Sequence, residues 1–219
     1  MGNIDNNGRI ELRKIIEFSE LFSLAPNSFL EIGSHTGKDA EYISYHLGID
    51  AEKIYVLEAH PVFFTQIKKT YPNFEVYNLA AWNKTEDVHF FATSHAHDGR
   101  SSVKDRDIYE NSGFVSITVS GSRMDDFFKS QKIPPPDIVK IDVEGAAFEV
   151  LQGFGEELSN VKLVQVETEQ REIWQEQKIK DSVFNILHEA GFSLAWQVDL
   201  GINQNDSVWV NNKYFTEQK

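Results

Sequence analysis

The chain has 219 residues, 41% of them apolar, and a formal net charge of −13. This length and apolar content predict one globular domain, and no apolar run approaches the roughly 20 residues of a membrane span. The absence of cysteine excludes disulfides, cysteine–zinc sites and thiol catalysis. The acidic charge argues against a nucleic-acid partner. Because no signal peptide is visible, we expect a soluble cytoplasmic protein, and the oligomeric state stays open.

The spacing of apolar and turn-forming residues predicts an alternation of helices and strands. Pro61 suits the first turn of a helix, Ser122 is the expected N-cap of another, and Gly48 and Gly191 are expected helix ends. The predicted helices are 10–24, 38–47, 61–72, 122–131, 145–152 and 179–190. The predicted strands are 29–33, 53–58, 74–80, 87–93, 114–119, 137–142, 161–167, 192–198 and 207–210. The last two strands form an antiparallel pair, and the alternation predicts a doubly wound, Rossmann-like, mostly parallel α/β sheet of seven core strands, preceded by an N-terminal helix.

The segment 137–145 carries the strongest functional signal. It reads Asp-Ile-Val-Lys-Ile-Asp-Val-Glu-Gly, an apolar β-branched run that ends in Asp142 and Glu144, with Gly145 allowing a turn. This is typical of a buried parallel strand that presents charge at its carboxyl end. Ligands of open α/β sheets bind beyond these ends, so we expect the site there.

A glycine-bracketed turn, Gly33-Ser34-His35-Thr36-Gly37, follows the first predicted strand. It lacks the G-x-G-x-x-G pattern of dinucleotide-binding turns, and Glu31 would repel a pyrophosphate. Glu31 would favour a cationic amino-acid portion, as in S-adenosylmethionine, while Glu58 at the end of the second strand is placed to accept both ribose hydroxyls. Gly33, Ser34 and Gly37 are therefore candidate cofactor contacts. The alternative is a structural turn with two solvated glutamates.

Three residues after the third strand are candidates for contact with an adenine ring. Ala80 and Ala81 are small enough for close approach, and Trp82 could stack on the ring. The alternative is that Trp82 is simply a core aromatic.

Several motifs in chain order resemble the FkbM-type family of class I S-adenosylmethionine-dependent methyltransferases. The matching segments are Phe29–Gly37, Leu57–Pro61, Asn78–Trp82, Ser101-Ser102, Arg123–Phe128 and, most specifically, Asp137–Leu151. Through the matched motifs, Ala59 becomes a candidate cofactor contact and Ser102 a candidate acceptor contact. The family often has Asp in place of Glu31 and Ala-Asn in place of Ser34-His35, so contacts near His35 are open.

The resemblance implies a class I methyltransferase domain over residues 28–219, with residues 1–27 as an N-terminal helical extension. It also implies O-methylation, frequently of hydroxyls on sugars, glycans or glycosylated natural products. The expected cofactor is S-adenosylmethionine, and the expected partner is a small-molecule or glycan acceptor.

A hydroxyl must lose its proton as it accepts a methyl group, which calls for a general base or a metal. Asp142 is the leading candidate to face the methyl group, and Glu144 would be the base or orient it, or alternatively cap the next helix. If the strands ending at Asp142 and Glu167 are neighbours, Asp142, Glu144 and Glu167 would meet. Such a cluster could hold Mg²⁺ or Mn²⁺, or one carboxyl could stay protonated through like-charge repulsion.

Two further regions are candidates for acceptor binding. His95 and His97 lie in the long polar segment 94–113 and would reach the acceptor, or else be merely solvated. Trp174 follows a run of acids and would be a platform for a sugar ring, or else a core residue.

Two other function classes fit the sequence less well. An NAD-dependent oxidoreductase requires the G-x-G-x-x-G turn that is missing here. A non-catalytic nucleotide-binding module would keep the glycine turn but would not need acids at several strand ends. A methyltransferase acting on a natural product that is not a carbohydrate remains the alternative acceptor class.

Overall fold

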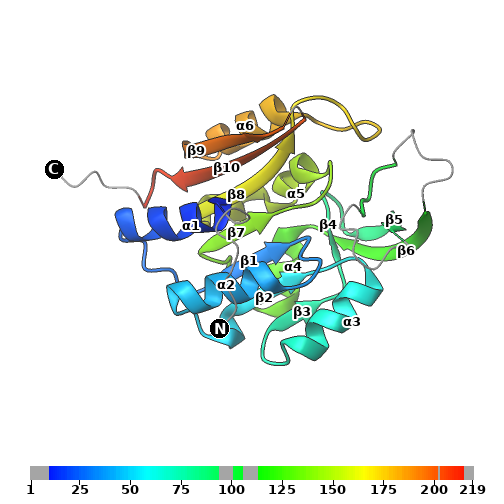
Figure 1. Ribbon diagram of the computed structural model, residues 1–219, viewed down its shortest axis with the longest axis horizontal. Coiled ribbons are helices and arrows are strands. Elements are labelled where there is room, and N and C mark those ends of the chain that lie inside the picture. The colour runs from blue at the N-terminus through cyan, green and yellow to red at the C-terminus, as the bar shows by residue number, and fades with distance from the viewer. Residues whose placement is uncertain (1–9, 94–100, 106–112, 202, 215–219) are drawn as a thin grey trace.

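The computed structural model describes residues 10–93, 101–105, 113–201 and 203–214, and its main feature is a seven-stranded sheet (Figure 1). The strand order is β3-β2-β1-β7-β8-β10-β9, in which β1, β2, β3, β7 and β8 are parallel and β10 is antiparallel to both of its neighbours. The strands are β1 (Phe29–Ile32), β2 (Ile54–Leu57), β3 (Glu75–Tyr77), β7 (Ile138–Ile141), β8 (Leu163–Glu169), β9 (Phe192–Leu200) and β10 (Gln204–Asn211). The predicted fold class is confirmed, including the antiparallel strand near the C-terminus.

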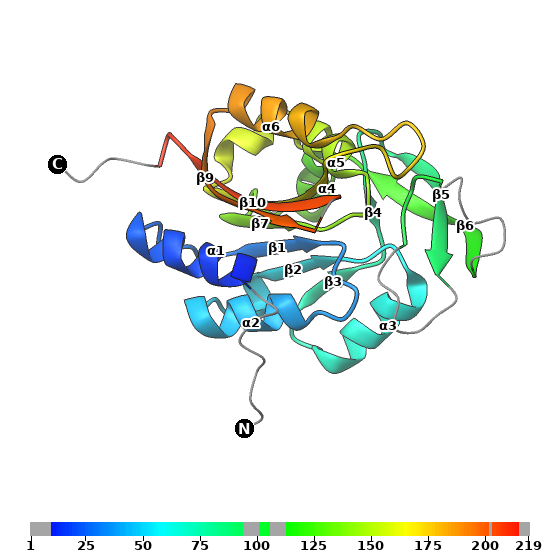
Figure 2. The same cartoon turned by 45° about the horizontal axis from the view of Figure 1, so that its top comes forward.

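Three helices cover each face of this sheet (Figure 2). One face carries α1 (Ile10–Leu21), α2 (Lys38–Leu47) and α3 (Pro61–Thr70), and the other carries α4 (Met124–Gln131), α5 (Ala147–Phe154) and α6 (Lys180–Glu189). Two short 3₁₀ helices, Ala51–Lys53 and Gly155–Asn160, precede β2 and follow α5. None of the helices that the structure describes combines the length and the hydrophobicity of a membrane span.

The central parallel strands have side chains in two separate cores. All four residues of β1, β2 and β7 are buried, as expected for parallel strands covered on both faces. Alternate residues point to opposite faces, so Leu30 and Ile32 pack with α4, α5 and α6, while Phe29 packs with α1, α2 and α3.

A second sheet contains three strands, in the order β4-β6-β5. Its strands are β4 (Ala80–Ala81), β5 (Glu86–Thr93) and β6 (Phe114–Ser122). The sequence predicted a single strand over 74–80, but the chain leaves the main sheet after Tyr77. The side-chain amide of Asn78 donates to the backbone carbonyls of Glu58 and Ala59, and β4 then pairs with β6. The predicted strand 87–93 exists, but it belongs to this second sheet.

Local signals located most helix ends correctly. Gly48 ends α2 with a φ of 65°, and Pro61 begins α3. The predicted cap at Ser122 is wrong: Arg123 precedes the first turn of α4, and the Ser122 hydroxyl donates to the Arg123 carbonyl instead.

Candidate active site

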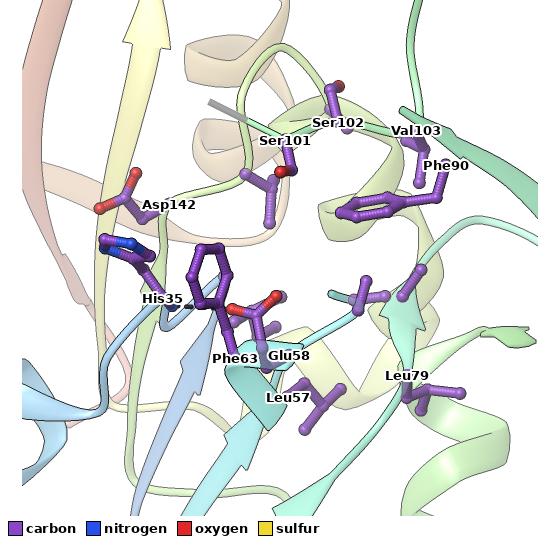
Figure 3. A pocket seen from close by; sticks show the side chains of 17 residues that line it. His35, Leu57, Glu58, Phe63, Leu79, Phe90, Ser101, Ser102, Val103 and Asp142 are labelled. Atoms are coloured by element: carbon purple, nitrogen blue, oxygen red, sulfur yellow. Dashed lines mark hydrogen bonds between the residues drawn. The ribbon is translucent and has the colours of Figure 1, made fainter. Parts of the chain in front are cut away.

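A hollow, which we call the main hollow, lies where the carboxyl ends of β1, β2 and β7 meet the second sheet. It encloses about 570 Å³ of space between atoms, its open mouth included. Figure 3 shows Asp142 and His35 on one side and Phe90 and Val103 on the other, with Glu58 and Phe63 below. The lining residues are Ile32, Gly33, His35, Leu57, Glu58, Ala59, Phe63, Leu79, Ala80, Ala81, Phe90, Ser101, Ser102, Val103, Asp142, Val143 and Ala146.

Gly33 allows the turn after β1 to lie directly against the end of β7. Its φ is +81°, and a Cβ there would lie 2.0 Å from the carbonyl oxygen of Asp142. Any side chain would therefore force the two strand ends apart. Gly37 closes the turn with a φ of +76° and packs against the ring of Tyr71. Both predicted glycines are thus required by the backbone, but only Gly33 lines the hollow.

Glu31 and Ser34 stabilise this turn from inside the protein. The Glu31 carboxylate is 1% exposed and accepts hydrogen bonds from the Ser34 hydroxyl (2.7 Å) and the Ala40 amide (3.2 Å). Neither residue lines the main hollow. The sequence predicts that Glu31 faces the ligand, but its side chain points to the α1–α2 face of the sheet, so any role in ligand binding is indirect.

Glu58 follows β2 and borders the hollow with both carboxylate oxygens held. Backbone amides of His35 (2.7 Å) and His60 (2.8 Å) each donate to one oxygen. Burial raises the pKa of Glu58 to about 7, although these amide hydrogen bonds oppose the shift. The glycine turn and the start of α3 therefore fix the orientation of this carboxylate.

The apolar part of the hollow combines predicted and unpredicted residues. Ala59, Ala80 and Ala81, the candidate cofactor contacts, line it. Phe63 of α3 and Phe90 of β5 were missed, because their patterns indicated only ordinary core positions. Trp82 does not line the hollow. Its ring lies instead 5.8 Å from the ammonium of Lys104.

Ser102 connects the hollow to the loop after β7. It lines the hollow, and its hydroxyl donates to the carbonyl oxygen of Glu144 at 2.5 Å. The Ser102 and Phe91 backbones form an isolated antiparallel bridge. Ser102, the candidate acceptor contact, thus lies beside the backbone of Glu144, the candidate base.

Asp142 lies at the edge of the main hollow and is paired with a buried lysine. The Lys140 ammonium is 2.7 Å from Asp142 Oδ2, 3.4 Å from Asp39 Oδ2 and 3.9 Å from Glu31 Oε1. Burial alone would lower the pKa of Lys140, but these three carboxylates raise it well above its usual value. Lys140 therefore stays charged and fixes the position of Asp142.

A cluster of three glutamates lies next to Asp142. Glu144, Glu167 and Glu169 each have a carboxylate oxygen within 4.8 Å of the others. Burial and the neighbouring carboxylates raise the pKa of Glu167 to about 10, and burial raises that of Glu169 to about 7. Glu169 accepts hydrogen bonds from the Gly145 amide and the Gln177 side chain. The expected meeting of Glu144 and Glu167 is thus observed, with Glu169 as the third member of the cluster in place of Asp142.

The remaining predicted acceptor residues divide into two cases. Trp174 is 1% exposed, and the carbon that a side chain would add at Gly145 would lie 2.4 Å from its ring. The sugar-platform prediction for Trp174 is therefore wrong, and the core alternative is right. His95 and His97 lie outside the described residues.

Solved structures with a similar fold are methyltransferases. One is the methyltransferase FkbM from Methylobacillus flagellatus KT, with a TM-score of 0.55 and 10% identity, covering 84% of this chain. This chain spans only 44% of the length of that protein. Another is a putative sarcosine dimethylglycine methyltransferase from Galdieria sulphuraria, with a TM-score of 0.51 and 7% identity, covering 91% of this chain and 84% of that one. A search of curated proteins found no match.

The sheet order and these similarities define a Rossmann-like methyltransferase fold. The model of the methyltransferase FkbM domain matches residues 31–194. The chain therefore belongs to the FkbM family of S-adenosylmethionine-dependent methyltransferases.

Proposed function

We propose that this protein is an O-methyltransferase that transfers the methyl group of S-adenosylmethionine to a hydroxyl of a small acceptor, a sugar or glycan. The observation that carries the cofactor part is the position of Glu58. Its fixed carboxylate borders an otherwise largely apolar hollow beside the Gly33 turn. A nucleoside needs this combination of an apolar wall and one strong acceptor for its ribose hydroxyls.

In this proposal, each side of the main hollow has a separate task. Ala59, Ala80 and Ala81 leave room for the flat adenine ring, and Phe90 packs against it. Glu58 accepts hydrogen bonds from the ribose hydroxyls. Because Gly33 has no side chain, the glycine turn leaves space for the rest of the cofactor to extend towards Asp142.

When bound, S-adenosylmethionine supplies an electrophilic methyl group that moves to the acceptor oxygen while the sulfur keeps the electron pair of the broken bond. The residues of the chain orient the acceptor and take its proton. Asp142 is fixed by Lys140 and orients the acceptor hydroxyl. Glu144 accepts the proton, since its backbone is held by Ser102 next to the hollow and its carboxylate belongs to the glutamate cluster.

The sugar or glycan acceptor is the class that the family resemblance implies. Carboxylates at the ends of β7 and β8 suit the hydroxyls of such a molecule, because ionised carboxylates are strong hydrogen-bond acceptors. A natural product with a hydroxyl but no sugar is the alternative acceptor, and an acceptor screen separates the two.

The glutamate cluster beside Asp142 could also bind a divalent cation. Glu144, Glu167 and Glu169 offer oxygen ligands of the kind that Mg²⁺ and Mn²⁺ prefer. Protons can neutralise the same cluster, as the raised pKa of Glu167 indicates. Activity after treatment with EDTA, with and without added MgCl₂ or MnCl₂, decides between these alternatives.

The function is tested by measuring release of S-adenosylhomocysteine with a panel of sugars, glycans and hydroxylated natural products. Glu144→Gln should lower turnover by about 10²- to 10⁴-fold, the range for loss of a general base, with little change in cofactor affinity. The exposed Glu156 provides the matched control Glu156→Gln. Full turnover in Glu144→Gln would remove Glu144 from the chemistry, and a protein that binds NAD but not S-adenosylhomocysteine would refute the methyltransferase proposal.

A further inference from the structure

A second cavity lies on the face of the sheet that α1 covers, and we call it the acidic cavity. It encloses about 610 Å³ of space between atoms, its open mouth included. Its lining residues are Ile10, Glu11, Lys140, Asp142, Gln165, Glu167, Leu200 and Asp206. Asp142 also lines the main hollow, so a ligand in the acidic cavity would end next to the expected position of the methyl group.

The acidic cavity contains more negative than positive groups. Four carboxyl groups line it, contributed by α1, β8, β10 and the end of β7. Glu167, whose pKa is raised to about 10, holds a proton at pH 7, and the other three face the single ammonium of Lys140. That ammonium is already surrounded by Asp142, Asp39 and Glu31. Burial raises the pKa of Asp206 to about 7, and Glu11 and Asp142 add to the shift while Lys140 opposes it. The carboxyl groups of the cavity thus have only the Lys140 ammonium as a counterion, and Asp39 and Glu31, which lie outside the cavity, interact with the same ammonium.

One lining side chain also has an unused hydrogen-bonding atom. Gln165 is 1% exposed, and its amide nitrogen donates to Asp206 Oδ1 at 2.9 Å. Its carbonyl oxygen Oε1 is buried and has no hydrogen-bond partner among the residues that the structure describes. An unsatisfied buried acceptor costs free energy, and a hydrogen-bond donor on a ligand in the cavity would satisfy it.

We propose that the acidic cavity is the acceptor pocket and that it selects an acceptor carrying a protonated amino group close to the hydroxyl that is methylated. The ammonium group can donate hydrogen bonds to the unpartnered Gln165 oxygen and to the carboxylates of Asp206 and Glu11. A neutral polyol would leave the negative charge of these two carboxylates without a counterion. The proposal rests on the methyltransferase function proposed above, because Asp142 connects the cavity to the main hollow.

The test uses glucosamine and glucose as a matched pair of probes that differ by one amino group. Each is titrated calorimetrically into the full-length protein, with and without saturating S-adenosylhomocysteine, at pH 7 in the presence of EDTA. Glucosamine should bind at least about tenfold more tightly than glucose, which corresponds to one charge-assisted hydrogen bond. It should bind to the S-adenosylhomocysteine complex without displacing the nucleoside.

Two variants of the lining and one control complete the experiment. Asp206→Asn and Glu11→Gln should each reduce the preference for glucosamine, while Asp181→Asn, an exposed position on α6, should keep it. Because the two substituted residues lie on different elements, β10 and α1, one variant can still be measured if the other folds poorly.

Several outcomes would overturn the proposal. These are equal binding or no binding of the two sugars, an unchanged preference in both lining variants, or binding of MgCl₂ at this cavity in place of glucosamine when MgCl₂ is titrated separately without EDTA. Competition between glucosamine and S-adenosylhomocysteine would instead assign the cavity to the amino-acid end of the cofactor and overturn the acceptor assignment. If the wild-type protein prefers glucosamine but does not bind S-adenosylhomocysteine, the proposed function is refuted and the amine site is still supported.

Discussion

Substitution of Glu58 by glutamine tests the proposed nucleoside site at its most constrained residue. The carboxylate is 6% exposed and already accepts two backbone amides, so it cannot move to another partner when a ligand is absent. Glutamine keeps the size but loses the charge, and its NH₂ group must face either the His35 or the His60 amide. A hydrogen bond to a charged group contributes roughly 1.5–3 kcal/mol, so the dissociation constant for S-adenosylhomocysteine should rise about 10- to 150-fold.

Calorimetric titration of S-adenosylhomocysteine into wild type, Glu58→Gln and the exposed control Glu52→Gln measures this effect. Urea unfolding of the same three proteins separates a binding defect from a folding defect. The affinity of wild type should also increase as pH rises through about 7, because Glu58 ionises there and becomes a stronger acceptor. If Glu58→Gln binds as tightly as Glu52→Gln, the ribose does not interact with Glu58 and the reasoning fails.

Three further predictions concern the glycine turn, the buried acids and the glutamate cluster. Gly33→Ala should destabilise the fold more than Gly48→Ala, because both have positive φ but only the first meets a neighbouring backbone; equal urea midpoints would contradict this. The folded protein holds protons on Glu58, Glu169 and Asp206 up to about pH 7, whereas the unfolded chain releases them near pH 4 to 4.5. Unfolding free energy should therefore fall as pH rises from about 5 to 8, and a rise would refute those shifts. If protons rather than a cation neutralise the cluster, EDTA will leave turnover unchanged; a loss that MnCl₂ restores would establish a metal site.

The sequence predicted best what depends on short segments. The buried run before Asp142 and the glycines at 33 and 37 are local signals, and the structure has the expected strand end and turn there. The break after Tyr77 was missed because it depends on the Asn78 side chain binding carbonyls about 20 residues earlier. No periodicity reveals such a contact.

Residues that meet across the sheet were harder to predict. Glu31, Lys140 and Gln165 lie side by side because β1, β7 and β8 are neighbours in register. Alternation along each strand puts them on one face, but only the strand order brings them together. Trp174 was misjudged for a related reason, since its polar neighbours in sequence do not indicate that it packs over Gly145.

A crystal structure of the protein with S-adenosylhomocysteine would test the central claim most directly. The account predicts the adenine between Ala80, Ala81 and Phe90, the ribose hydroxyls on Glu58, and the sulfur directed towards Asp142. A nucleoside bound elsewhere, or one in the main hollow with its ribose away from Glu58, would contradict it.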